Sequence, residues 1–322
     1  MKLLQMADPV RYPRMTTEEL RSTFLLDGMF QPGAITLAYV DLDRTVVGGA
    51  VPTGKALRLE TSPELRAEFF CERRELGVFN VGGSGTVTVD GKEFKLDKMD
   101  CLYVERGSRD VSFASDSTDK PAAFYLLSYL AHAEYPTAMV RFKDIEPVKL
   151  GAVATCNKRS IYKAIHRDGI KSCQLVMGFT LLEEGSNWNT MPPHTHMRRS
   201  EVYMYFDVDP AHRVVHLMGP PQETRHLVMA DRDIVVSPGW SIHAGVGTTR
   251  YGFCWGMGGE NQDYGDMDGV TVADLQLGER TDEIDWGEGT LPFRLRVFAE
   301  RGLGERRCAD ADSSAAECEG VA

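Results

Sequence analysis

The chain has 322 residues, 43% of them hydrophobic, so it can bury a sizeable core and is expected to hold two domains. Its formal net charge of −11 argues against nonspecific binding to nucleic acid or to an anionic membrane surface. A small anionic ligand is not excluded, because a binding site can be locally basic.

The cysteines and the N-terminus predict a cytoplasmic protein. The seven cysteines form no CxxC pair, which indicates reduced thiols and argues against a disulfide framework or a zinc knuckle. The start, MKLLQMADPVRYPRM, lacks the continuous apolar stretch of a signal peptide. No apolar run approaches the length of a membrane-spanning helix. We therefore expect neither a nucleic-acid nor a membrane partner.

The first part of the chain predicts an arm followed by a β domain. Residues 1–25 are expected to form an N-terminal arm and a short helix, which begins at Thr16-Thr-Glu-Glu. Residues 26–140 contain many short apolar or alternating runs separated by Gly, Asp and Pro, and Val89-Asp-Gly-Lys92 is typical of a tight hairpin. Closely spaced short strands predict a barrel or sandwich. The stretch 82–100 has no histidine, so this barrel is expected to be metal-free.

The pattern repeats in the second half of the chain. Residues 141–170 carry mixed charge and are predicted to be a partly helical linker or crossover. Residues 171–277 contain a second set of short β runs, which predicts a second barrel of similar size. Residues 278–322 are polar and then rich in Ser and Ala, and are predicted to be a partly disordered extension. The predicted fold class is therefore all-β, with two barrels and a few short helices.

Two histidine-containing segments of the second half predict a metal site. The stretch from Met191 to Glu201 reads MPPHTHMRRSE, and a second stretch, PGWSIH, ends at His243. His194 and His196 alternate as same-face residues of a strand do, and a turn at 197–200 must return Glu201 to that face. Three imidazoles and one carboxylate, His194, His196, Glu201 and His243, are the donors of a catalytic transition-metal site. The alternative for any single histidine is an ordinary buried or surface residue.

The HxH pair with a later Glu and a histidine after a Pro-Gly turn also resembles the cupin pattern, in which a small β-barrel holds a metal in its mouth. Longer blocks resemble a specific family, the 4-deoxy-L-threo-5-hexosulose-uronate ketol-isomerases, also called 5-keto-4-deoxyuronate isomerases. The matching blocks are 155–167, 172–179, 191–209, 219–230, 237–250 and 255–268. The first half fits more loosely, through 11–26 and 79–92.

The resemblance implies a two-barrel cupin (bicupin) that is a homohexamer and binds one zinc ion per chain through His194, His196, Glu201 and His243. It also implies an aldose–ketose isomerase, an intramolecular oxidoreductase. The family interconverts 4-deoxy-L-threo-5-hexosulose uronate and 3-deoxy-D-glycero-2,5-hexodiulosonate, in the breakdown of unsaturated uronates from pectin. The extension after about residue 276 departs from the family, but it touches none of the motifs. The donors alone leave the metal open among Zn, Mn, Fe and Ni.

Isomerisation requires a polarised carbonyl and a proton carrier, unless a hydride shift takes its place. The residues favour Glu223 or His226 as the carrier, with Tyr205 and Tyr264 as second choices. The carboxylate of a small sugar-acid substrate requires a cation, and the candidates are Lys163, Arg199 and Arg225. Trp240, Trp255 and Met257 are expected to wall the cavity, although ordinary core positions are the alternative for each.

Three other functions remain open from the sequence. The nearest is 5-deoxyglucuronate isomerase of inositol catabolism, which has the same scaffold and a similar substrate. An Fe(II)-dependent cupin dioxygenase uses the same three-histidine, one-glutamate donor set. A sugar-binding or regulatory cupin without catalysis is the third, although a pure binding protein has no need of four metal donors.

Overall fold

The computed structural model describes residues 1–259 and 265–276. β-Strands dominate it, which confirms the predicted fold class. The single α-helix of the described residues, α1 (Thr17–Phe24), begins at the predicted place. Its capping box pairs the Thr16 hydroxyl with the Glu19 amide and the Glu19 carboxylate with the Thr16 amide. No helix in this part of the chain is long and apolar enough to cross a membrane.

The N-terminal half forms a seven-stranded sheet, in the order β1-β3-β4-β11-β6-β9-β12, and a four-stranded sheet, in the order β5-β10-β7-β8. The large sheet consists of β1 (Lys2–Leu4), β3 (Ile35–Val40), β4 (Thr45–Ala50), β11 (Phe124–Leu130), β6 (Arg74–Asn80), β9 (Cys101–Val104) and β12 (Ala138–Val140). The small sheet consists of β5 (Leu57–Arg58), β10 (Val111–Ser115), β7 (Gly85–Val89) and β8 (Lys92–Leu96). Asp90 and Gly91 have positive φ and make the predicted hairpin between β7 and β8.

The C-terminal half repeats this arrangement, with a seven-stranded sheet in the order β13-β14-β15-β23-β18-β21-β2 and a four-stranded sheet in the order β16-β22-β19-β20. The large sheet consists of β13 (Val148–Leu150), β14 (Arg159–Ile165), β15 (Val176–Leu182), β23 (Gly252–Met257), β18 (Glu201–Phe206), β21 (Ile234–Ser237) and β2 (Leu25–Leu26). The small sheet consists of β16 (Trp188–Asn189), β22 (Ile242–Gly247), β19 (Val214–Gly219) and β20 (Arg225–Met229). A separate pair joins β17 (His194–Thr195) to β24 (Asp268–Gly269).

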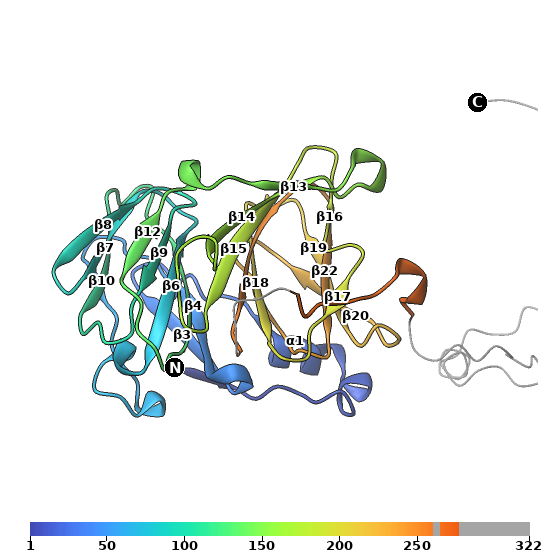
Figure 1. The fold of residues 1–322 in the computed structure, drawn as a ribbon, viewed down its shortest axis with the longest axis horizontal. Helices are drawn as coiled ribbons and strands as arrows, with labels where there is room; N and C mark the ends of the chain where they lie inside the picture. The colour runs from blue at the N-terminus through green and yellow to red at the C-terminus, as the bar shows by residue number, and fades with distance from the viewer. Residues whose placement is uncertain (260–264, 277–322) are drawn as a thin grey trace, which may run out of the picture. The chain divides into compact units, whose positions relative to one another are not determined.

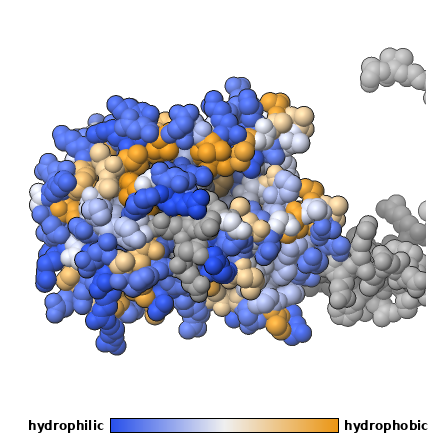
Figure 2. All heavy atoms as spheres, viewed as in Figure 1, coloured by the Kyte–Doolittle hydropathy of each residue, from blue (hydrophilic) through white to orange (hydrophobic). Residues whose placement is uncertain are grey.

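The two halves lie side by side (Figure 1), and three buried apolar clusters form their interiors and the contact between them. Within each half, the large sheet faces the small sheet and encloses its own buried cluster, so that each half is a flattened barrel. The third cluster lies between the two large sheets and contains residues of both, for example Phe79 stacked on Phe179 at 4.8 Å. Figure 2 shows a mostly hydrophilic face, with hydrophobic side chains gathered where β13 crosses it.

The segments predicted to flank the barrels belong to their sheets. In the stretch 141–170, β13 and β14 are strands of the second large sheet, and helix occurs only as the short 3-10 turns η5 (Phe142–Asp144) and η6 (Val153–Thr155). At the N-terminus, β1 pairs with the first large sheet and β2 with the second. The domain boundaries therefore stay a prediction, and the predicted extension at 278–322 lies outside the described residues.

Candidate metal centre

The four predicted donors come from three strands at one end of the second barrel. His194 begins β17, and His196 follows it at the same-face spacing. The chain then turns through 197–200, and β18 begins at Glu201, so the turn brings the carboxylate back to the histidines as predicted. A second turn, closed by the hydrogen bond from the Ser241 amide to the Pro238 carbonyl, leads into β22 and His243.

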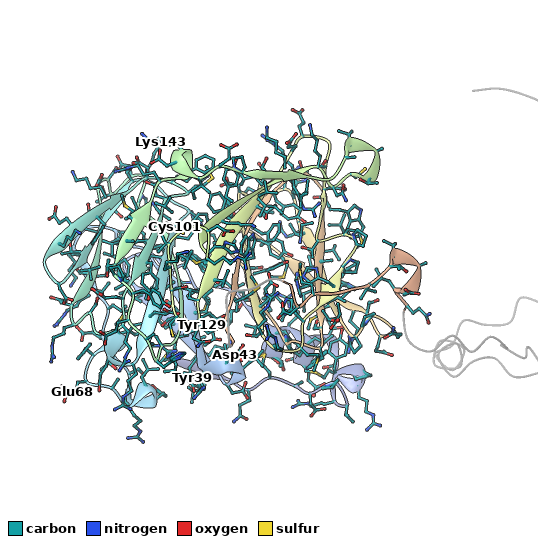
Figure 3. All side chains as sticks on the ribbon, viewed as in Figure 1. Tyr39, Asp43, Glu68, Cys101, Tyr129 and Lys143 are labelled. Carbon is teal, nitrogen blue, oxygen red and sulfur yellow. The ribbon has the colours of Figure 1, made fainter. Side chains whose placement is uncertain are left out.

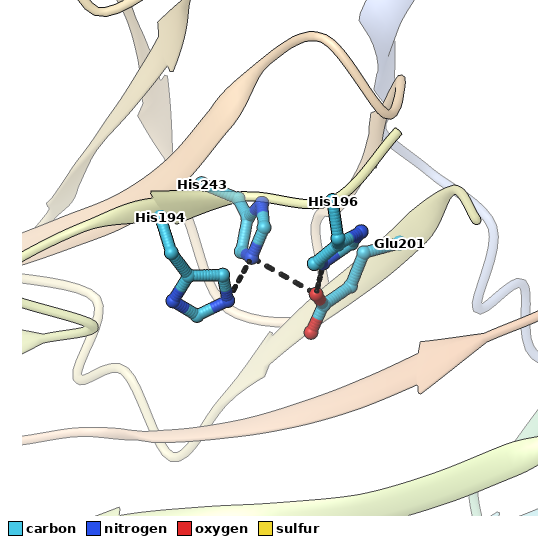
Figure 4. A group of neighbouring side chains, drawn as sticks. All are labelled: His194, His196, Glu201 and His243. Atoms are coloured by element: carbon cyan, nitrogen blue, oxygen red, sulfur yellow. Dashed lines mark hydrogen bonds and ion pairs between the residues drawn. The ribbon is translucent and has the colours of Figure 1, made fainter. Parts of the chain in front are cut away.

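The donor atoms of these residues converge on one point (Figure 4). All four lie within 4.8 Å of one another. One Glu201 carboxylate oxygen lies 2.8 Å from His196 Nε2 and 2.9 Å from His243 Nε2. His243 Nε2 also lies 3.0 Å from His194 Nε2. His194 is half-buried and the other three are buried, so the cluster opens to the outside at His194.

The far sides of two rings fix their tautomers. His196 Nδ1 lies 2.9 Å from the Arg199 carbonyl and His243 Nδ1 lies 3.4 Å from the Ser241 carbonyl. A carbonyl only accepts, so each Nδ1 carries the proton and each neutral ring turns the lone pair of Nε2 toward Glu201. Lone pairs and a carboxylate that face one another at about 3 Å repel, and a divalent cation between them converts the repulsion into coordination. The donor set therefore fits a metal ion.

Burial and neighbouring side chains together set the pKa values of the donors. Burial, reinforced by His243, lowers the pKa of His194 to about 3, which keeps that ring neutral and able to bind a cation. Burial also disfavours the charged form of His196, but with no metal bound a second proton on Nε2 hydrogen-bonds Glu201, which outweighs burial and raises the His196 pKa. Burial alone would raise the pKa of Glu201; the neighbouring His243 and His196 hold it well below the usual range. Glu201 is therefore an anion at neutral pH.

The first barrel braces the turn that carries the donors. Asp43, labelled in Figure 3, lies on the 3-10 turn η2 (Leu42–Arg44) between β3 and β4. Its carboxylate accepts a hydrogen bond from the Ser200 amide at 3.0 Å and another from the Ser200 hydroxyl at 2.5 Å. Ser200 is buried and lies between Arg199, whose carbonyl fixes His196, and the donor Glu201. The metal-binding turn therefore depends on a residue far away in the sequence.

A cavity of about 370 Å³ opens beside the donors, and His194 and Glu201 are part of its wall. Its apolar wall is made by Val148, Leu150, Ile161, Phe253, Trp255 and Met257, and its polar wall includes Arg159, Lys163, Thr180, Thr190, Arg199 and Tyr203. A volume of this size suits a small molecule. Three cations face it beside one carboxylate, so the cavity is suited to an anion although the whole chain is acidic.

Comparison with known proteins assigns the family. A sequence model of the KduI/IolB family matches residues 30–270. A 4-deoxy-L-threo-5-hexosulose-uronate ketol-isomerase of Halalkalibacterium halodurans is 51% identical over 268 residues, which are 83% of this chain and 97% of the relative. The chain belongs to the KduI/IolB family. A ketol-isomerase of the same name from Opitutus terrae is also 51% identical, over 86% of this chain and 100% of its own length.

A solved structure has a similar fold. An IolB-like protein of Salmonella typhimurium LT2 superposes with a TM-score of 0.61 at 13% identity, over 77% of this chain and 97% of that protein. At this identity the likeness concerns the fold alone. It agrees with the predicted pair of cupin-type barrels.

The predicted substrate-binding residues lie in different places. Lys163 and Arg199 line the cavity, and Arg199 is buried and paired with Asp266 at 2.9 Å. Arg225 does not line it, because its guanidinium donates to the carbonyls of Tyr12 and Met15 and so fastens the N-terminal arm to β20. The structure thus brings two of the three predicted cations to the site.

The predicted proton carriers, Glu223 and His226, do not line the cavity. On β20 the alternate residues Leu227 and Met229 are buried in the barrel. His226 lies on the opposite face of this strand, points outward and is exposed. Glu223 lies in the loop that precedes this strand. The structure therefore gives the pair no contact with the donors of its own chain. Tyr205, a second choice, is buried against His216, and Tyr264 lies outside the described residues.

Several residues of the cavity wall were not predicted from the sequence. Arg159, Thr190 and Tyr203 line it, and the hydroxyl groups of Thr190 and Tyr203 lie 3.0 Å apart. Arg159 could have been found from its spacing to the predicted Lys163, four residues along one strand, but that segment was interpreted as a linker. Trp255 and Met257 line the cavity as expected, whereas Trp240 packs edge-on against Tyr12 and does not.

His216 is a histidine inside the second barrel that is not one of the four donors. It is fully buried, and its Nδ1 lies 2.7 Å from the Tyr205 hydroxyl. Burial, with a smaller effect of His243, lowers the pKa of His216 to about 3, so it is neutral at physiological pH. His216 is a core histidine with a hydroxyl partner, which is the ordinary role that a single histidine has in a protein.

Proposed function

We propose that this chain is a metal-dependent ketol-isomerase that interconverts 4-deoxy-L-threo-5-hexosulose uronate and 3-deoxy-D-glycero-2,5-hexodiulosonate. The observation that carries the proposal is the convergence of three histidines and one glutamate at the wall of a small cationic cavity. The relatives that are 51% identical are named for this activity and match almost their whole length. The proposal includes a role in the breakdown of pectin-derived uronates.

His194, His196, Glu201 and His243 hold the metal in this proposal, and zinc, one ion per chain, is the metal we expect. A divalent metal with an open position supplies a Lewis acid that polarises a carbonyl and stabilises an enediolate. Glu201 supplies the negative charge of the site, and the three neutral imidazoles leave the loaded site net positive. This charge suits the anion that develops during isomerisation.

Other residues of the cavity position the sugar. Burial, and to a smaller extent Glu201, raise the pKa of Tyr203 well above its usual value. Its hydroxyl therefore keeps its proton and can donate a hydrogen bond to a substrate oxygen, while the Thr190 hydroxyl orients it. Trp255, whose indole N–H donates to the Thr180 hydroxyl at 3.1 Å, forms a rigid apolar wall that excludes water. Lys163 remains our proposed contact to the substrate.

Isomerisation by proton transfer also needs a proton carrier. Glu223 and His226 are candidates from the sequence alone, and a carrier must come within hydrogen-bond reach of the substrate. In a homohexamer, which we propose from the family resemblance, surface loops of one chain can face the cavity of another. Glu223→Gln and His226→Gln therefore test whether either residue acts across a subunit contact, since neither does so within its own chain.

The test is an isomerase assay on 4-deoxy-L-threo-5-hexosulose uronate, before and after chelator treatment and with zinc added back. We expect conversion that the chelator abolishes and zinc restores. Metal analysis should give one ion per chain, and light scattering should give six chains per particle. No conversion by metal-loaded protein, combined with turnover of 5-deoxyglucuronate, would replace the proposal with the inositol-pathway isomerase. Oxygen consumption by the iron-loaded protein would instead indicate a dioxygenase.

A further inference from the structure

One face of β14 forms a wall of the cavity and carries two cations. Arg159, Ile161 and Lys163 are alternate residues of this strand, and all three line the cavity. In the sheet, Ile161 lies opposite Thr180 on β15, and Thr180 lies opposite Phe253 on β23. The cavity floor is therefore the inner surface of the large sheet, with the donor Glu201 on β18 and the two cations on β14.

Arg159 has no carboxylate partner among the residues that the structure describes. One guanidinium nitrogen donates to the Asn157 carbonyl at 2.9 Å, which leaves most of its five N–H groups for another acceptor. Burial lowers the pKa of Arg159, which shows that its environment disfavours the charge. Arg199, by contrast, is held by Asp266. A half-buried cation without an anion is costly, and a ligand carboxylate would offset that cost.

Tyr203 lies between Arg159 and the metal donors. In the sheet register, Tyr203 lies two residues from Glu201 on β18, toward the row of Phe206, Gly252 and Leu181, and Arg159 lies opposite Leu182, one row further. Arg159 and the donors are therefore two separated polar points at one cavity, and Tyr203 and Thr190, whose hydroxyl groups lie 3.0 Å apart, also line it.

We propose that Arg159 binds the carboxylate of the substrate, while the carbonyl end of the sugar acid lies at the metal donors. The identity of the ligand rests on the proposed function, but the class of ligand, a small carboxylate, follows from the cavity. A guanidinium fork matches a carboxylate with two parallel hydrogen bonds, which fixes direction as well as charge. Ile161, beside Arg159 on the same face, offers no hydrogen bond and so suits carbon 4 of the sugar, which carries no hydroxyl group.

The proposal is tested by binding to metal-stripped protein, in which the sugar acid is bound but not converted. Calorimetry compares the sugar acid with its methyl ester, which lacks the charge. We expect the wild type to prefer the acid by about 10- to 100-fold, the range of a charge-assisted hydrogen-bonded pair. Arg159→Met, which keeps the length of the side chain, should bind acid and ester alike. Arg159→Lys, which keeps the charge and loses the fork, should retain part of the preference.

Two further variants separate Arg159 from its neighbours. Lys158→Met is the matched control, because Lys158 pairs with Glu183 at 2.9 Å and does not line the cavity; it should keep the full preference. Lys163→Met should lose less of it than Arg159→Met. A wild type that binds acid and ester equally, or an Arg159→Met protein that still prefers the acid, overturns the proposal. So does a preference lost in Lys163→Met alone. A failure of the proposed isomerase appears separately, as absent conversion by metal-loaded wild type.

Discussion

The two barrels share a topology but fill their interiors differently. The two large sheets have matching strand orders, and so do the two small sheets. Leu76 of β6 pairs with the last residue of β9, as Glu201 of β18 pairs with the last residue of β21. In the first barrel this inward position is apolar, and β10 adds Val111 and Phe113 to the interior. In the second barrel the corresponding regions hold Glu201 and His243 beside a cavity.

The difference shows what a site requires of this scaffold. A close-packed apolar interior stabilises the first barrel at the positions where the second barrel carries its donors. The second barrel gives up part of its apolar interior for four donors and a cavity, and it obtains support from outside itself. Asp43 holds its metal-binding turn, and the buried carboxylate of Glu75 accepts hydrogen bonds from the amides of Cys173, Gln174 and Leu175 at 2.6–2.8 Å. The first barrel therefore serves as the support for the second.

The largest effect is expected at the donors themselves. His243→Ala should lose bound metal and lower kcat/KM by at least about 100-fold, more than the loss of a supporting residue costs, because one of four donors is removed. The protein should stay folded, as judged by circular dichroism. His212→Ala, at a histidine of the same barrel that hydrogen-bonds Thr248, is the control and should keep its metal. A fully active, metal-free His243→Ala protein would show that the metal site is assigned wrongly.

The next effect concerns stability. Glu75→Gln removes a buried carboxylate that accepts hydrogen bonds from three backbone N–H groups and from the Tyr103 hydroxyl. The side-chain NH2 group of the introduced glutamine would face hydrogen-bond donors and would have no acceptor there. We expect the free energy of unfolding to fall by about 3 kcal/mol, measured by urea denaturation. Glu93→Gln, at an exposed position of β8, is the control. If the first barrel is only a neighbour and not a support, the two variants should be equally stable.

Asp43→Ala separates support of the metal site from support of the fold. Without its carboxylate the buried Ser200 amide loses its acceptor, and we expect metal affinity to fall by about 10-fold in a chelator competition. Asp43→Asn, which keeps one acceptor oxygen, should recover part of the affinity. Asp41→Ala removes a carboxylate of the same turn that accepts only from the Met6 amide, so it controls for lost stability. Equal metal affinity in the two alanine variants would show that Asp43 does not support the metal site.

The smallest effect is expected for the C-terminal extension. The H. halodurans relative is matched over 97% of its length by 83% of this chain, and the donors and cavity lie before residue 277. A chain that ends at Gly278 should therefore convert the substrate at a rate within about two-fold of that of the full-length chain, since a change away from the donors and the cavity has little effect. Loss of solubility or a change of particle mass on gel filtration would show that the extension packs against the barrels.

The metal donors were predictable because their signals are local. The two-residue spacing of His194 and His196, and the Pro-Gly turn before His243, determine face and position without knowledge of the rest of the fold. The α1 capping box and the hairpin at Asp90-Gly91 were predictable for the same reason.

The substrate side was harder to predict because it depends on contacts between distant strands. Arg159 was missed because β14 (RSIYKAI) lacks a regular alternation of apolar and polar residues and is recognisable as a strand only from its place beside β15. His226 was chosen for its position between the two donor motifs. The apolar residues Leu227 and Met229, one and three positions after it on the same strand, already indicate that it faces outward. Asp43 gives no signal in the sequence, because its partner is 157 residues away.

The pairing of β2 with β21 has a consequence for the synthesis of this protein. Leu25 and Leu26 pair with Val235 and Ile234, so the arm finds its place only after about 210 further residues have been made. At about 5–20 residues per second, this takes on the order of ten to forty seconds. During that time the apolar side chains of α1 and β2 are available to a chaperone or to a neighbouring nascent chain. Slow translation, for example at low temperature, should therefore lower the yield of folded enzyme more than the stability of the folded protein suggests.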